Sequence, residues 1–83
     1  MHEVVDLTLR EISRAVERVL GRPVTLSDQT DIARDLQVDS LALMNIVMEL
    51  EDAFDLSIPL DRLALVQTVG DLSGLVTDLR TQG

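Results

Sequence analysis

Apolar residues recur at helical spacing at the start of the chain. They alternate at four and three positions: Val5, Leu9, Ile12, Val16 and Val19. This is the period of one face of an α-helix, so the pattern predicts a helix from about Glu3 to Leu20, ended by Gly21 and Pro23. Charged residues on its other side are spaced to pair with one another along the helix: Glu11, Arg14 and Arg18.

Residues 21–39 keep no clear period. A connection this long is unusual in a compact domain unless it has structure or function of its own. Apolar side chains along it provide anchors over the ends of the helices: Val24, Leu26, Ile32, Leu36 and Val38. We therefore expect an ordered loop, with a short helical turn over residues 31–36 that Thr30 caps.

The most apolar periodic segment begins at Ser40 and predicts a second long helix, to about Phe54, capped by Asp39 or Ser40. Its core stripe comprises Ile46, Val47, Leu50 and Phe54. An adjoining side carries Leu41, Met44 and Met48, flanked by Asn45, Glu49 and Asp52. Methionines at this spacing are either additional core or a partly exposed, adaptable docking surface, and the sequence leaves both open.

Two further helices follow. Pro59 ends the preceding segment, and residues 60–66 predict a short helix in which Leu60, Leu63 and Val66, or Ala64, close the core. Thr68 and Asp71 resemble a capping box at the start of a helix from Val69 to about Arg80. Its buried side would hold Val69, Leu72, Val76 and Leu79.

No segment shows the alternation of a strand, so we predict an all-α fold. Three main helices and one short helix would form a small bundle with a long loop between the first two main helices. We expect residues 1–83 to be a single domain. Because the chain begins at Met1, we expect a free-standing protein. We also expect a monomer.

Composition narrows the functional classes. The net charge is −8 and the only aromatic residue is one phenylalanine, so nucleic acid is not an expected partner. Without cysteine the chain has no disulfide, thiolate metal site or thiol nucleophile. No apolar run is long enough to span a membrane and the N-terminus lacks a signal peptide pattern, so we expect a cytoplasmic protein without stable membrane insertion.

Ser40 is the candidate functional residue. The unpaired N–H groups and the positive dipole end of a helix start favour a negative charge there, such as a phosphate on this serine. The only histidine, His2, lies at the other end of the chain, so nothing near in sequence activates Ser40 as a nucleophile. The serine is predicted to be an attachment point, and no enzymatic activity is expected.

Four features in order resemble the acyl carrier protein family, which includes carrier domains of polyketide and peptide synthases. They are Asp39-Ser40-Leu41, the helix from Leu43-Met44 to Phe54 with its interspersed acidic residues, Ile58-Pro59, and Thr68-Val69-Gly70-Asp71-Leu72. The resemblance covers nearly the whole chain. It implies that Ser40 carries 4′-phosphopantetheine, whose thiol holds acyl groups as thioesters.

The resemblance also implies partners. A phosphopantetheinyl transferase would use coenzyme A and Mg²⁺ to load Ser40, with Asp39 contributing to recognition. Acyl-loading and acyl-transferring enzymes would then dock on the second long helix. The residues expected in this docking are Leu41, Met44, Asn45, Met48, Glu49 and Asp52. An aliphatic core is also suited to take in an acyl chain, at about 0.8 kcal/mol per methylene before any cost of opening it.

Two departures from the family pattern are visible. Gln37 stands where a glycine is common, so the turn before Ser40 must do without that freedom or adopt another shape. Ala42 and Asn45 replace acidic residues common in carriers of fatty acid synthesis. We therefore expect a specialised carrier that serves polyketide, lipid or other secondary pathways, and not the general carrier of fatty acid synthesis.

Three alternatives remain open from the sequence. The first is a peptidyl or aminoacyl carrier domain of a peptide synthase. The second is an acidic helical interaction module in which Ser40 stays unmodified. A calcium-binding protein is weaker, since no stretch has the spacing of an EF-hand loop.

Overall fold

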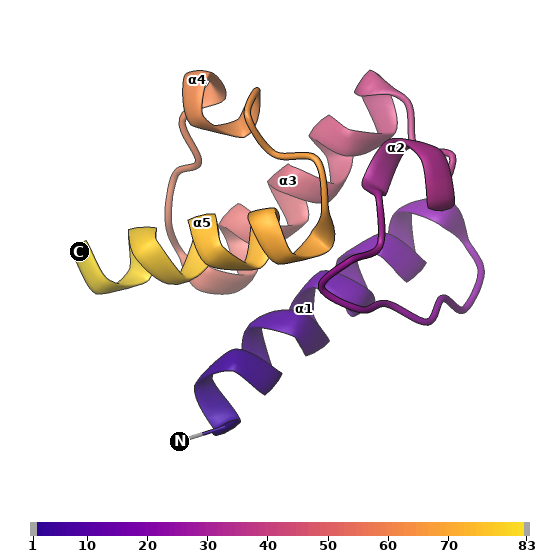
Figure 1. Ribbon diagram of the computed structural model, residues 1–83. Helices are drawn as coiled ribbons and strands as arrows, with labels where there is room; N and C mark the ends of the chain where they lie inside the picture. Colours follow the sequence, from indigo (N-terminus) through magenta and orange to yellow (C-terminus); the bar gives the residue numbers. More distant parts are fainter. Residues whose placement is uncertain (1, 83) are drawn as a thin grey trace.

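The computed structural model describes the backbone of residues 2–82 and the side chains of residues 7–81. Over this range the chain forms five α-helices and no β-strand, which confirms the all-α prediction (Figure 1). Their bounds are α1 His2–Leu20, α2 Ile32–Asp35, α3 Ser40–Phe54, α4 Leu60–Leu63 and α5 Val69–Gln82. Among the described residues, no helix is both long and apolar enough to cross a membrane.

The core lies between the three long helices, with α1 packed on both α3 and α5 (Figure 1). On α1, Ile12 and Val16 are buried as predicted, while Leu9 and Val19 pack partly buried against the core. The side chains of Val5 and His2 lie outside the described residues. Gly21 ends α1 with a positive φ of 73°, and its N–H donates to the Glu17 oxygen at 2.8 Å.

The charged side of α1 differs in part from the prediction. Glu11 and Arg14 pair along the helix at 3.5 Å. Arg18 instead reaches across to Glu49 of α3, with Nη1 and Oε1 3.0 Å apart. The predicted pairing of Arg18 along α1 is therefore wrong, because no residue three or four positions from Arg18 is acidic.

The segment between α1 and α3 is an ordered loop around α2, as predicted, but its cap is different. Asp31 is the N-cap of α2, and its Oδ1 accepts from the Arg34 N–H at 2.8 Å. The predicted cap, Thr30, uses its hydroxyl to accept from the Ser27 N–H at 2.9 Å. Thr30 was the wrong choice because its hydroxyl is already engaged in the preceding turn.

Backbone hydrogen bonds tie this loop to the start of α5. The Ile32 N–H donates to the Gln67 oxygen at 3.0 Å, and the Val69 N–H donates to the Thr30 oxygen at 2.9 Å. These bonds join positions 35 and 39 residues apart. They hold α2 beside the segment between α4 and α5.

Helix α3 has the predicted bounds and core stripe. Ile46, Val47 and Leu50 are buried, and Phe54 is partly buried. Asp55 ends the helix in the left-handed conformation, with φ 53°.

Helix α4 is shorter than the predicted segment 60–66. Backbone bonds of four-residue spacing end at Ala64, and those of Leu65 and Val66 have three-residue spacing. This tighter turn rotates the later residues, so Val66 joins Leu63 at the core. The prediction for Leu60 is wrong, since it is 65% exposed at the first position of α4, and Ala64 is exposed too.

Helix α5 begins with the predicted capping box. The Asp71 N–H donates to the Thr68 hydroxyl at 3.1 Å, and the Thr68 N–H donates to the Asp71 carboxylate at the same distance. The helix runs two residues beyond the predicted Arg80. Its buried side holds Val69, Leu72 and Val76, with Leu79 partly buried, as predicted.

Candidate functional site

Ser40 is exposed and is the first residue of α3. The residue before it, Asp39, is the N-cap, and its Oδ1 accepts from the Ala42 N–H at 2.8 Å. Of the two caps that the sequence allowed, the structure therefore selects Asp39. The hydroxyl of Ser40 lies at the surface beside the capping carboxylate, and the two predicted site residues lie together.

The start of α3 favours an added anion at Ser40. In the first turn the N–H groups of Ser40 and Leu41 have no intrahelical acceptor, and the helix dipole places a partial positive charge there. The first turn of α3 contains no acidic side chain. A phosphate on the Ser40 oxygen would therefore meet N–H donors, with Asp39 as the nearby opposing charge.

The turn before Ser40 depends on a residue in an uncommon conformation. Gln37 has φ 56°, in the left-handed region that glycine adopts most easily. Its neighbours Leu36 and Val38 are both buried in the core, so the turn at Gln37 is anchored on each side. The turn thus keeps the shape that a glycine would favour, although the chain has glutamine there.

A groove opens beside Ser40, and we call it the Ser40 groove. Its volume is about 530 Å³, and α2, the start of α3 and the segment before α5 enclose it. The lining residues are Asp31, Ile32, Ala33, Arg34, Val38, Asp39, Ser40, Leu43, Val66 and Gln67. Sequence reasoning missed Arg34, Val66 and Gln67, since no local pattern connects them with Ser40.

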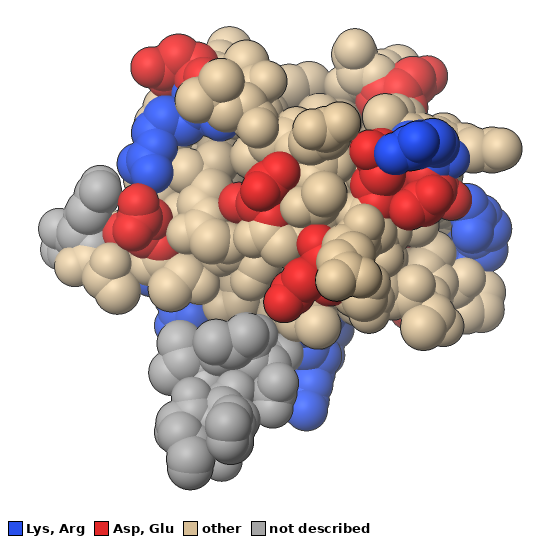
Figure 2. Space-filling view, in the orientation of Figure 1, with Lys and Arg blue, Asp and Glu red and all other residues tan. Residues whose placement is uncertain are grey.

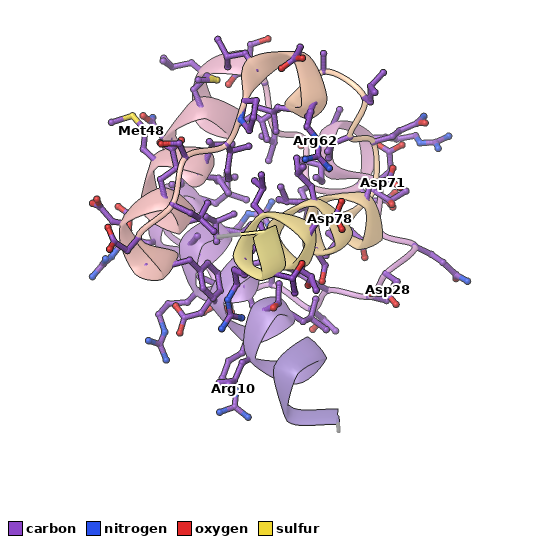
Figure 3. The ribbon with its side chains drawn as sticks, turned by 90° about the vertical axis from the view of Figure 1, so that its left-hand side faces the viewer. Arg10, Asp28, Met48, Arg62, Asp71 and Asp78 are labelled. Carbon is purple, nitrogen blue, oxygen red and sulfur yellow. The ribbon has the colours of Figure 1, made fainter. Side chains whose placement is uncertain are left out.

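The predicted docking residues lie on the outer side of α3. Leu41, Met44 and Met48 are 72%, 37% and 59% exposed, so the two methionines are not additional core. Figure 3 shows Met48 pointing away from the bundle. Asn45 and Asp52 are exposed as well. Glu49 is less available, because it is half-buried and paired with Arg18.

Charge is distributed unevenly over the surface. Figure 2 shows acidic side chains in several separate places on one face, and acidic and basic atoms together over α2. A second groove, of about 710 Å³, contains Arg14, Arg18 and Arg80 together with Glu49 and Asp52. In that groove Arg80 stacks over the Phe54 ring, 4.8 Å from its centre. Among the described residues, no group of three or more His, Cys, Asp or Glu side chains could hold a metal ion.

Comparisons with known proteins agree with this geometry. The family model described as "Phosphopantetheine attachment site" matches residues 10–76. A Caulobacter vibrioides protein named "Probable acyl carrier protein" is 65% identical over 82 residues, covering 99% of this chain and 95% of the relative. Another protein of that organism, named "Acyl carrier protein", is 32% identical over 73 residues, covering 88% of this chain and 94% of the relative.

A solved structure has the same fold. The solution structure of holo acyl carrier protein from Geobacter metallireducens matches with a TM-score of 0.81 and 28% identity, covering 90% of this chain and 87% of that one. The chain therefore belongs to the acyl carrier protein family: it is a carrier of acyl groups on a covalently attached 4′-phosphopantetheine, and not an enzyme.

Proposed function

We propose that Ser40 is the residue that carries the 4′-phosphopantetheine and that Asp39 belongs to the same site. The observation that carries this proposal is the exposed position of Ser40 at the first residue of α3, within the matched segment 10–76. A phosphate ester there needs room, N–H donors and no buried charge, and the start of α3 satisfies these needs. When bound, the group supplies a thiol that holds acyl chains as thioesters.

The loading step is a transfer from coenzyme A. The Ser40 oxygen forms a bond to the phosphorus that bears the pantetheine, and the bond from that phosphorus to the bridging oxygen breaks. Adenosine 3′,5′-bisphosphate leaves, and the serine proton passes to a base of the transferase or to water. Ser40 contributes the accessible oxygen, and Mg²⁺ on the transferase offsets the phosphate charges.

Asp39 has two roles in this proposal. Its carboxylate caps α3 through the Ala42 N–H, which fixes the backbone on which Ser40 stands. Only one carboxylate oxygen is used in that bond, and Asp39 is exposed. The other oxygen is therefore available to the transferase and its Mg²⁺.

We propose the outer side of α3 as the surface that partner enzymes contact. It presents Leu41, Met44, Asn45 and Met48 next to Ser40, with Glu49 and Asp52 further along. Exposed methionines suit contact with several partners, because their unbranched side chains adapt to different surfaces. The partners are the phosphopantetheinyl transferase and the enzymes that load and remove acyl groups.

We propose a specialised carrier, in polyketide or lipid biosynthesis, that works as a cytoplasmic monomer. Two Caulobacter vibrioides proteins are similar to this chain. The sequence identity of this chain to the one named "Probable acyl carrier protein" is 65%, about twice its identity of 32% to the one named "Acyl carrier protein". An organism with two such relatives has a second carrier beside the one with the plain family name. The lack of acidic side chains in the first turn of α3 supports the same assignment. The competing assignment is a carrier in peptide synthesis.

The attachment residue is tested by intact mass. The protein is incubated with coenzyme A, Mg²⁺ and a broad-specificity phosphopantetheinyl transferase, and is then weighed. We expect a single phosphopantetheine addition in the wild type and in Ser57→Ala, which changes an exposed serine in the loop after α3. Ser40→Ala should show none. A wild type that is never loaded would favour the unmodified interaction module, and loading of Ser40→Ala would disprove the assignment of the residue.

A further inference from the structure

The Ser40 groove has the size and lining of a binding site for a flexible, partly polar chain. Its volume of about 530 Å³ is in the range of pockets that take drug-sized molecules. Ile32 and Val38 provide buried apolar surface, and Leu43 and Val66 add partly buried surface. Gln67, which also lines the groove, is a polar residue with an exposed side chain. Since Ser40 itself lines the groove, anything attached to its oxygen is tethered at the entrance.

Arg34 is the basic side chain in this lining, and it is loosely held. Its side chain is 79% exposed, and its guanidinium lies 3.5 Å from Asp31 Oδ2, at the long end of hydrogen-bonding distance. The other oxygen of Asp31 is engaged in capping α2 through the Arg34 N–H. The cap does not depend on the guanidinium, so this group is able to turn toward another anion without loss of the cap.

A cation near the phosphate on Ser40 would offset its negative charge further. A phosphodiester adds one negative charge to a chain of net charge −8, next to the carboxylate of Asp39. Arginine is the side chain best suited to pair with phosphate oxygens, since its planar group donates two parallel hydrogen bonds. Arg34 lines the same groove as Ser40, where this charge is added.

We propose that Arg34 binds the phosphate of the prosthetic group on Ser40 and that the Ser40 groove holds the pantetheine arm between visits to partner enzymes. This inference rests on the proposed attachment at Ser40. On loading, the guanidinium exchanges Asp31 for the phosphate. The apolar lining residues of the groove contact the methyl groups of the arm, and Gln67 contacts its amides. Arg34 is thus a positioning residue for the arm and takes no part in chemistry.

The test compares the apo and loaded forms of the full chain by NMR. Intact mass first establishes loading, so a failure to load is seen separately and would remove both proposals. In the loaded wild type we expect nuclear Overhauser contacts from the two methyl groups of the arm to methyls of Val38, Leu43 and Val66. We also expect the guanidinium signal of Arg34 to shift between the apo and loaded forms.

Variants distinguish a specific role of the Arg34 side chain from a general effect of net charge on the arm. Because an exposed ion pair is weak, Arg34→Gln should lower the docked population of the arm roughly two- to fivefold, with weaker contacts in proportion. Arg34→Lys, which keeps the charge, should retain part of them. The control is Arg10→Gln, which removes the same charge from α1 at an exposed position that points away from the bundle (Figure 3). Arg10→Gln should show the same arm contacts as the wild type.

Two results would overturn the proposal. One is an arm whose contacts are confined to residues 39–41, with an Arg34 signal equal in the apo and loaded forms. The other is equal contacts in Arg34→Gln and wild type. The apo spectrum of Arg34→Gln checks that α2 is intact, which the retained Asp31 cap predicts.

Discussion

The backbone N–H of Gly70 donates a 2.9 Å hydrogen bond to the carbonyl oxygen of Asp28. A side-chain carbon at position 70 would lie only 2.8 Å from the same oxygen. Gly70 therefore permits the loop between α1 and α3 to lie directly against the start of α5. Asp28 lies on the loop beside α5 in Figure 3. The contact helps to position α2, and with it one wall of the Ser40 groove.

Gly70→Ala should destabilise the protein by about 1 to 3 kcal/mol, because the added methyl group must push a backbone carbonyl away. Gly74→Ala, in the same helix, is the matched control, since nothing lies within 4 Å of its added carbon. It should stabilise the protein by about 0.5 to 1 kcal/mol through helix propensity. Urea denaturation measures both. Equal effects of the two substitutions would contradict the close approach at Gly70.

Gln37→Gly should stabilise the protein by about 0.5 to 1 kcal/mol. The left-handed conformation of Gln37 costs more than the added entropy of glycine in the unfolded chain. Asp55→Gly changes the other non-glycine residue with positive φ in the described chain, and it should gain less because aspartate tolerates this conformation better. Thermal denaturation measures the change in stability of both variants. A loss of stability in Gln37→Gly would show that the glutamine side chain makes a contribution larger than its strain.

Asp71 predicts a pH dependence of stability. Hydrogen bonds from the backbone N–H of Thr68, and then of Gln67, lower the pKa of this carboxyl below its ordinary value of 3.8. A carboxyl with a lowered pKa in the folded state stabilises it above the unfolded pKa, and this stabilisation is lost as the pH falls through the folded pKa. The advantage of the wild type over Asp71→Asn should therefore be full above pH 3.8 and shrink below it. Denaturation midpoints across this range measure it, and a constant difference would contradict the assignment.

Met48→Glu should slow loading by partner enzymes while leaving the fold intact. Met48 is 59% exposed, so the substitution places a charge on the surface without opening the core. If Met48 contributes at least about 1 kcal/mol to docking, kcat/KM for loading falls by about fivefold or more. Leu7→Glu, at a 45% exposed position on α1, is the control. The surface assignment fails if both variants load at the wild-type rate or are slowed equally.

The sequence by itself determined the elements whose causes are local. The helix from Ser40 to Phe54 has its apolar period, its two candidate caps and its end within one short stretch, so its bounds were predictable. The capping box of Thr68 and Asp71 was predictable for the same reason. Ser40 itself stood out because the start of a helix is recognisable from neighbouring residues.

Only the tertiary structure decided the contacts between distant segments. Arg18 pairs with Glu49 across 31 positions, and Gly70 lies against Asp28, because helix packing brings these backbones together. The Ser40 groove has the same origin, since its walls come from three separate parts of the chain. Local periodicity and capping depend on residues within a turn or two of each other, whereas such walls depend on how whole helices pack. The proposed attachment residue, Ser40, could therefore be identified from the sequence, whereas its surroundings could not.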